Sequence, residues 1–219
     1  MQLLEVEVNG QAGWFWALSK WEATVFSIIG KNKKSPEDDQ AVRFEVVDGK
    51  PYLWATDSAH LVCAQPKCES PPPDGSMYVK ACSLKPRAGK LLVKNMMLIP
   101  WMQPTTYTSA RYTMATNDAL PAEPHGDLDL SGPCNWDVTA LFASLRHLPP
   151  DVLGMATPSS WNVAGRFAHT LAAVAKATED ADHIWIASPT LGGERCLEVS
   201  TKDVHGAEWV VCIAPLKTR

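Results

Sequence analysis

The sequence lacks the motifs by which many enzymes and membrane proteins are recognised. It has no GxxxxGK[ST] or GxGxxG phosphate loop, no GxSxG nucleophile elbow and no HExxH zinc motif. No run of about 18 apolar residues is present, so no membrane span is predicted. The first ten residues, MQLLEVEVNG, carry acids where a signal peptide carries basic and apolar residues. We therefore expect a cytoplasmic protein that needs no cofactor.

Close cysteine pairs are also missing. The six cysteines are scattered, and the nearest two, Cys63 and Cys68, are five residues apart. Zinc sites usually need tighter pairs, so no metal is predicted, and the cysteines indicate buried thiols in a reducing compartment. Asp57, His60 and Cys63 could form a nucleophilic site. Strand alternation puts His60 and Cys63 on opposite faces, which favours an Asp-mediated turn instead.

One long stretch has no acidic residue. The 219-residue chain has 20 Lys and Arg, 24 Asp and Glu and a net charge of −4. Residues 75–117 nevertheless contain six basic and no acidic residues, and a second basic cluster occupies residues 31–34. Local positive charge on an acidic body suits a phosphate backbone. The alternative is an ordinary solvated surface whose balancing acids lie elsewhere in the sequence.

Hydrophobic patterns predict an α+β fold with antiparallel sheets and few helices. Spacings of three and four predict helices over residues 14–29, 138–148 and 165–177, with a weaker one over 83–92. Alternating or apolar runs predict strands over 3–8, 41–47, 51–65, 76–81, 94–101, 107–115, 183–188, 196–200 and 208–214. Turn-forming residues over 120–132 mark a boundary between two small domains, 1–130 and 131–219.

The segment LWATDSAHL, residues 53–61, resembles the DNA sliding clamps of bacterial polymerase III, the beta-subunit processivity factors. That family usually has Gly after the Asp and a basic residue before the Leu, where this chain has Ser58 and His60. Residues 161–188 and 208–216 are similar, in the same order, to the last helix and the terminal strands of a clamp. Residues 95–160 fit the pattern poorly.

The resemblance implies a compact two-domain clamp that encircles duplex DNA without reading its bases, is not an enzyme and tethers a polymerase or other partner proteins. Two-domain clamps close as trimers, so a homotrimeric ring, of phage or mobile-element type, is expected. DNA would face the basic residues on or beside helices: Lys20, Lys31, Lys33, Lys34, Lys85, Arg87, Lys90, Arg166 and Lys176. A partner peptide would bind at Thr56, His60, Leu61, Val211, Pro215 and Leu216.

Two other functions stay open at this point. The nine tryptophans are many for a chain of this size, and exposed ones could stack on bases in a non-ring α+β module that binds nucleic acid or protein. An enzyme that uses Asp57, His60 or Cys63 is the third possibility. Trp14, Trp21 and Trp185 fit sheet-facing positions, and the clamp interpretation does not account for the others.

Overall fold

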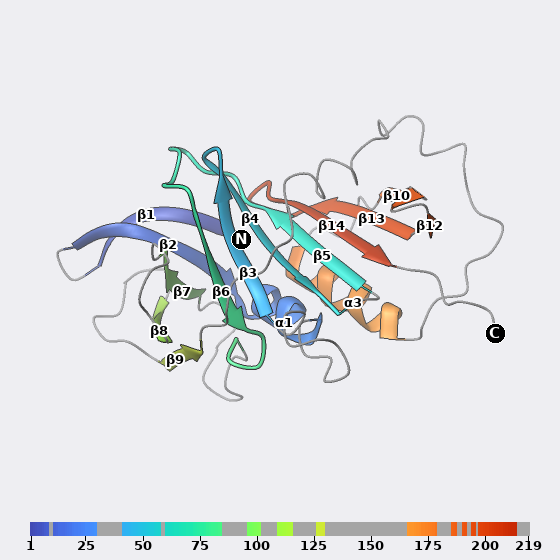
Figure 1. Cartoon of the computed structure of the whole chain (residues 1–219), viewed down its shortest axis with the longest axis horizontal. Coiled ribbons are helices and arrows are strands. Elements are labelled where there is room, and N and C mark those ends of the chain that lie inside the picture. The colour runs from blue at the N-terminus through green and yellow to red at the C-terminus, as the bar shows by residue number, and fades with distance from the viewer. Residues whose placement is uncertain are drawn as a thin grey trace.

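The computed structural model describes residues 1–8, 11–29, 41–57, 60–84, 96–101, 109–115, 126–129, 166–178, 185–187, 190–191, 194–195 and 197–213. Within these residues, two antiparallel sheets of five and seven strands pack with two helices, and a two-stranded ribbon is added (Figure 1). The predicted α+β class with antiparallel sheets is therefore confirmed.

The five-stranded sheet has the order β1-β2-β7-β8-β9. Its strands are β1 (Gln2–Val8), β2 (Gln11–Ser19), β7 (Met96–Pro100), β8 (Ser109–Ala115) and β9 (Gly126–Asp129). The strands predicted over 3–8, 94–101 and 107–115 are confirmed as β1, β7 and β8. The short strand β9 lies inside the 120–132 segment that the sequence assigned to turns.

The seven-stranded sheet has the order β10-β13-β14-β5-β4-β3-β6. Its strands are β3 (Ala41–Val47), β4 (Lys50–Thr56), β5 (His60–Gln65), β6 (Gly75–Lys80), β10 (Trp185–Ala187), β13 (Leu197–Lys202) and β14 (Glu208–Ile213), and the ribbon is β11 (Thr190–Leu191) with β12 (Glu194–Arg195). The corresponding strand predictions are confirmed. The β3–β4 turn has positive φ at Asp48 (52°) and Gly49 (69°), the conformation that two-residue hairpins favour.

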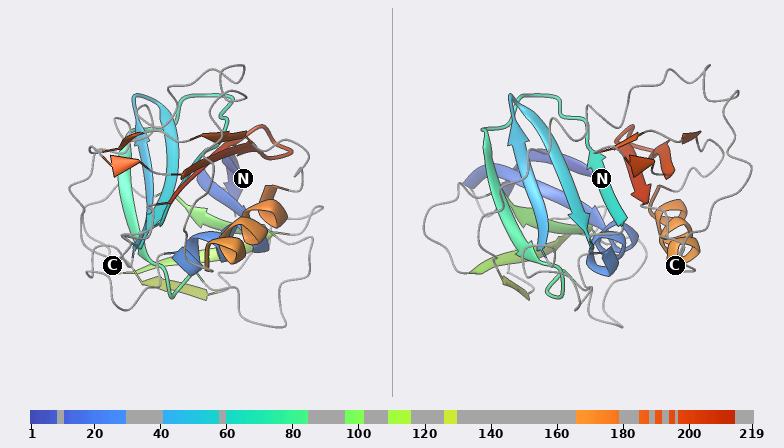
Figure 2. Two further views of the ribbon diagram at one scale, coloured as in Figure 1. Left: turned by 90° about the vertical axis from the view of Figure 1, so that its right-hand side faces the viewer. Right: turned by 45° about the vertical axis from the view of Figure 1, so that its right-hand side comes forward.

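The larger sheet joins the beginning and the end of the chain. β14 pairs with β5 from Glu208↔Gln65 to Ile213↔His60, and β13 and β10 extend the sheet beyond β14. The two helices, α1 (Lys20–Ile29) and α3 (Arg166–Thr178), lie side by side (Figure 2). Elements of both predicted domains therefore share one sheet and one core. The division near residue 130 stays a prediction, because residues 130–165 lie outside the described part.

The first helix begins at Lys20, and the prediction of a helix from Trp14 is wrong for residues 14–19. These residues belong to β2, which pairs with β1 and β7. Trp16 and Leu18 face the main core, whereas Phe15 and Ala17 face a second small cluster. Because apolar residues cover both faces of this strand, some of them also fit the spacing of a helix.

A capping box marks the true start of α1. The Glu22 backbone N–H donates to Ser19 Oγ at 3.3 Å, and the Ser19 N–H donates to Glu22 Oε2 at 2.6 Å. This reciprocal pair satisfies two backbone donors at the helix start. The motif Ser-x-x-Glu was present in the sequence and would have located the boundary. The helix predicted over 165–177 is confirmed as α3, while residues 138–148 and most of 83–92 lie outside the described part.

Tryptophan builds the core. Trp16 makes edge contacts with Phe44 and Trp101, with ring centroids 5.3 and 5.9 Å apart, and Trp209 packs on Phe26 at 5.5 Å. Of the six tryptophans whose side chains are described, Trp16, Trp54, Trp101 and Trp209 are buried, and the other two are half-buried. None of these six offers an exposed stacking platform, so the described part of the chain gives no support to the single-strand-binding alternative.

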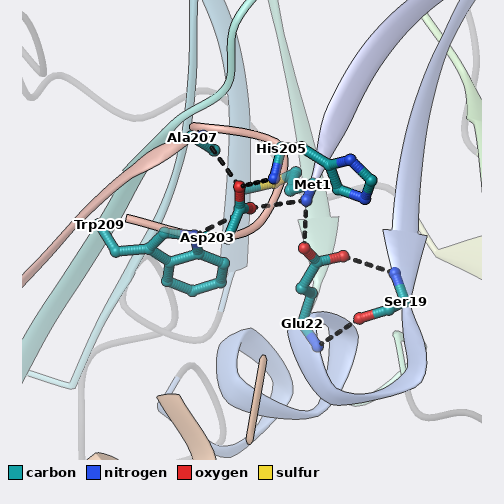
Figure 3. A network of polar contacts seen from close by, with 7 residues as sticks. All are labelled: Met1, Ser19, Glu22, Asp203, His205, Ala207 and Trp209. Atoms are coloured by element: carbon teal, nitrogen blue, oxygen red, sulfur yellow. Dashed lines mark hydrogen bonds and ion pairs between the residues drawn. The ribbon is translucent and has the colours of Figure 1, made fainter. Parts of the chain in front are cut away.

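A buried polar network ties three distant segments together (Figure 3). The Met1 ammonium pairs with Glu22 at the start of α1 and lies 2.7 Å from Asp203 Oδ2 in the β13–β14 turn. Asp203 also accepts the backbone N–H groups of His205 and Ala207, each at 2.9 Å, and the Trp209 indole N–H at 3.3 Å. Since its partners come from the residue before β1, from the turn and from β14, this one carboxylate connects the beginning of the described chain to its last strands.

The substitution Asp203→Asn tests that role. It removes one of the two carboxylates that compensate a buried ammonium, and breaking a buried ion pair from one side costs about 3 kcal/mol. We expect a lower urea midpoint with an unchanged slope. The control is Glu69→Gln, a charge removal at an exposed loop position, which should leave the free energy of unfolding within about 0.5 kcal/mol of the parent value. Equal midpoints for both variants would contradict the assignment.

Candidate nucleic-acid interface

The two described helices expose no carboxylate. Their sequences, KWEATVFSII and RFAHTLAAVAKAT, contain a single acid, Glu22. Glu22 is 2% exposed and is occupied by the Met1 ammonium and by the capping box. The charged side chains that α1 and α3 can present to solvent are therefore basic.

The structure brings two of the predicted DNA-facing residues together. Lys20 is the first residue of α1, and Lys176 is exposed in the last turn of α3. Their ammonium groups lie 5.6 and 4.8 Å from the centroid of the same ring, that of Trp21. The sequence analysis missed Trp21 as part of this group, because only the packing of α1 on α3 places Lys176 beside it.

Of the other predicted basic residues, one lies in α3 and the rest lie outside the described part of the chain. Arg166 is the first residue of α3, and nothing is described of its side chain. His169, which the sequence analysis did not single out, is exposed three residues later in the same helix. Helical spacing puts residues 166, 169 and 176 on one face, and this spacing was readable from the sequence. The remaining predictions, Lys31, Lys33, Lys34, Lys85, Arg87 and Lys90, lie outside the described residues.

The predicted peptide site centres on the tight turn between β4 and β5. The Thr56 hydroxyl donates to the His60 carbonyl at 2.9 Å, and the His60 N–H donates to Asp57 Oδ1 at 2.8 Å. The His60 ring is held by the same carboxylate, with Nδ1 3.0 Å from Oδ1. All three side chains are buried. The Asp-mediated turn that the sequence favoured is confirmed.

The apolar members of the predicted peptide site divide between the two faces of the sheet. Leu61 pairs with Cys212 and belongs to a cluster on the face away from the helices, formed with Tyr52, Trp54, Cys63 and Val210. Val211 belongs to the main core on the other face. The structure therefore brings Thr56 and Leu61 together on one face of the sheet, and it separates them from His60 and Val211, which point to the other face. Pro215 and Leu216 lie outside the described residues, shortly after Ile213, which pairs with His60.

The geometry is unfavourable for a cysteine nucleophile. Cys63 lies in the cluster with Leu61, whereas the neighbouring Val62 and Ala64 face the main core, so Cys63 and His60 point to opposite faces. Burial raises the pKa of the Cys63 thiol well above its usual range, and the Glu45 carboxylate raises it further. A thiol held in its neutral form is a poor nucleophile. In the described part of the chain, no group of His, Cys, Asp and Glu could hold a metal ion.

None of the described helices has the length and apolar character to cross a membrane.

Comparison with known proteins gives matches only to solved structures. No protein-family model and no curated protein sequence matches this chain. The beta chain of DNA polymerase III from Streptococcus pneumoniae aligns with a TM-score of 0.54 and 12% identity, over 100% of this chain and 67% of that one. The beta subunit from the DNA polymerase of Streptococcus pyogenes aligns at 0.55 and 9%, over 97% of this chain and 68% of that one.

The fold is that of a DNA sliding clamp. A third match, the polymerase sliding clamp of Pseudomonas aeruginosa with a ligand, aligns at a TM-score of 0.50 and 9% identity, over 94% of this chain. This chain spans 65–68% of the length of these three clamps. The resemblance seen in the sequence is thus supported at the level of the fold, by neighbours that are only 9–12% identical to this chain.

Thiol labelling tests the description of the sheet around the turn. Cys82 is exposed, whereas Cys63 and Cys212 are buried. Burial raises the pKa of the half-buried Cys68 to about 11, so at pH 8 only about a thousandth of it is thiolate. We expect mass spectrometry to find the label on Cys82 well before these three, with Cys68 gaining reactivity only as the pH approaches 11. Cys82→Ser is the control, and rapid labelling of Cys63 in the folded protein would contradict the burial.

Proposed function

We propose that this chain is a sliding-clamp-like processivity factor, which surrounds duplex DNA and tethers a polymerase or other partner proteins to it. The observation that carries the proposal is a clamp fold whose described helices expose basic but no acidic side chains. Such a protein holds DNA by charge and topology, so it requires neither a catalytic residue nor a cofactor. The buried, neutral Cys63 fits this non-enzymatic role.

The charge distribution suits a protein that must slide. Contacts to phosphates position a protein on DNA and carry no sequence information. A net charge of −4 opposes adhesion of the whole surface to DNA. Lys20 and Lys176, with Arg166 on the same helix as Lys176, would face the duplex. We assign the same role to the basic residues at positions 31, 33, 34, 85, 87 and 90.

Ring closure requires more than one copy. The chain has about two thirds of the length of the clamps that it matches, and two domains, 1–130 and 131–219, would give a ring of three chains. β6 ends one side of the seven-stranded sheet. The backbone groups on the outer side of such an edge strand can pair with a strand of another copy. We place the partner-peptide site at the turn of Thr56, His60 and Leu61 with the chain beyond β14, where Pro215 and Leu216 would complete it, and we leave out Val211, which is buried in the main core.

Retention on DNA circles tests encirclement. Protein is incubated with a nicked circular plasmid and with the same plasmid made linear, and each mixture is passed through a sizing column at roughly 0.2 M salt to weaken simple electrostatic binding. A ring stays on the circle and slides off the free ends of the linear DNA. Blocking both ends of the linear DNA with a bulky protein should restore retention. Equal retention on circular and on unblocked linear DNA would contradict encirclement.

The oligomeric state tests the ring independently of DNA. The chain has a mass of 23.9 kDa, and we expect light scattering at micromolar concentration to give about three times this value. X-ray scattering in solution should show a particle with a central hole. A strict monomer across this concentration range would refute the ring, and a stable dimer would refute the trimer.

A further inference from the structure

We propose that Trp21 is a positioning residue, which holds Lys20 and Lys176 as a pair of uncompensated ammonium groups for two phosphates of a DNA duplex. This inference rests on the proposed function, and it names the part of the helix pair that would contact the phosphate backbone of the DNA. The observation behind it is that two lysines, from two helices distant in sequence, both lie close to the indole ring of Trp21.

The ring itself is fixed. Trp21 is half-buried in the first turn of α1, and part of it packs against the main hydrophobic core. Lys20 reaches this ring from the same helix at 5.6 Å, and Lys176 reaches it from α3 at 4.8 Å. Both distances fall within the roughly 6 Å at which an aromatic ring attracts a cation, so the two ammonium groups lie no more than roughly 12 Å apart.

An aromatic ring holds a lysine without neutralising it. A carboxylate would cancel the charge and accept its hydrogen bonds, whereas a ring face attracts the cation and leaves its three N–H donors available. Neither Lys20 nor Lys176 forms an ion pair with any residue in the described part of the chain, where Glu22, the acid of these helices, is buried. Two close cations that the described residues leave without a counter-ion are a site for anions.

The position of Lys20 is not explained by helix stability. It lies at the first residue of α1, where the helix dipole disfavours a positive charge and favours an acid. Glu22, the acid that favours the positive end of the helix dipole, is buried and forms an ion pair with the Met1 ammonium. Lys20 therefore adds a positive side chain at the positive end of the helix dipole. This arrangement costs a little helix stability and increases the attraction of a phosphate.

The experiment compares matched tryptophan variants. Trp21→Leu keeps an apolar side chain and removes the ring, whereas Trp21→Phe keeps a ring face. The control is Trp14→Leu, since Trp14 is likewise half-buried and packs against the same core. Binding of a short fluorescein-labelled duplex of random sequence is measured by anisotropy between roughly 50 and 200 mM salt. We expect Trp21→Leu to weaken binding at low salt about two- to fivefold, Trp21→Phe to retain most of the affinity, and Trp14→Leu to match the parent.

The lysines are tested in the same titrations. Lys20→Gln and Lys176→Gln should each reduce the slope of log affinity against log salt by about 0.9, the change expected for one lost phosphate contact. The control is Lys50→Gln at the exposed β3–β4 turn, which lies at the end of the strands away from α1 in Figure 1. This variant should leave the slope unchanged.

A spectroscopic readout separates positioning from a general loss of structure. The ring current of Trp21 should shift the ε-methylene proton resonances of two lysines upfield in the parent protein. Lys20→Gln should remove one shifted signal, Lys176→Gln the other, and Trp21→Leu both, while Trp14→Leu retains them. These signals are assigned in the folded parent and in the lysine variants, so the test holds even where Trp21→Leu fails to fold.

The outcomes distinguish the inference from the proposed function. Trp21→Leu with unchanged affinity, or an equal loss for Trp21→Leu and Trp14→Leu, overturns the positioning role while the lysine effects still support DNA binding. Absence of shifted lysine signals in the parent overturns it as well. A parent protein without salt-dependent binding to the duplex overturns the inference, whereas the proposed function is overturned separately, by equal retention on the nicked circle and on unblocked linear DNA.

Discussion

The pairing of β14 with β5 is the contact on which the rest of the structure depends. It joins residues 208–213 to residues 60–65 in an antiparallel register, with β3 and β4 on one side and β13 and β10 on the other. Closing so long a loop costs chain entropy before any contact is made. Burial of Trp209 and Val211 with Val62 and Ala64 opposes that cost, and the carboxylate of Asp203 fixes the turn that leads into β14. The same register places Ile213 beside the turn at Asp57.

This pairing also determines the electrostatics of the helix pair. Because β14 returns to β5, α3 packs on α1, and Lys176 reaches a tryptophan that belongs to the other end of the chain. Glu22, the acid of these two helices, is buried and pairs with the Met1 ammonium. On the sheet face away from the helices, Glu45 is also buried and accepts the Trp54 indole N–H at 3.1 Å and the Tyr78 hydroxyl at 3.0 Å. A chain of net charge −4 thus presents basic helices by turning particular acids inward.

Local patterns were sufficient for most strands and for α3, because alternation and helical spacing are properties of neighbouring residues. They failed at residues 14–19, where apolar residues on both faces of β2 fit either period, although Ser19 and Glu22 carried the correct signal. The separation of Leu61 from Val211 could not be predicted from the sequence, because it depends on the register of two strands that are distant in the chain. The composition showed that tryptophans are numerous, but it could not predict where they lie. Their position became clear only in the packed core, where Trp16 contacts Phe44 and Trp101.

Within the described residues, cations lie over the rings of both Trp21 and Trp54, with different consequences. Arg43 is 1% exposed and lies over the Trp54 ring at 4.1 Å, on a face of the sheet where both partners are buried. A planar guanidinium stacks well and binds acceptors in a fixed geometry, which suits a rigid site. At Trp21 the ring is half-buried and the cations are lysines, compact charges on flexible stems without a preferred fork geometry. A protein that must hold a phosphate backbone yet move along it needs contacts of the second kind, because each contact has to form again at the next phosphate without a precise orientation.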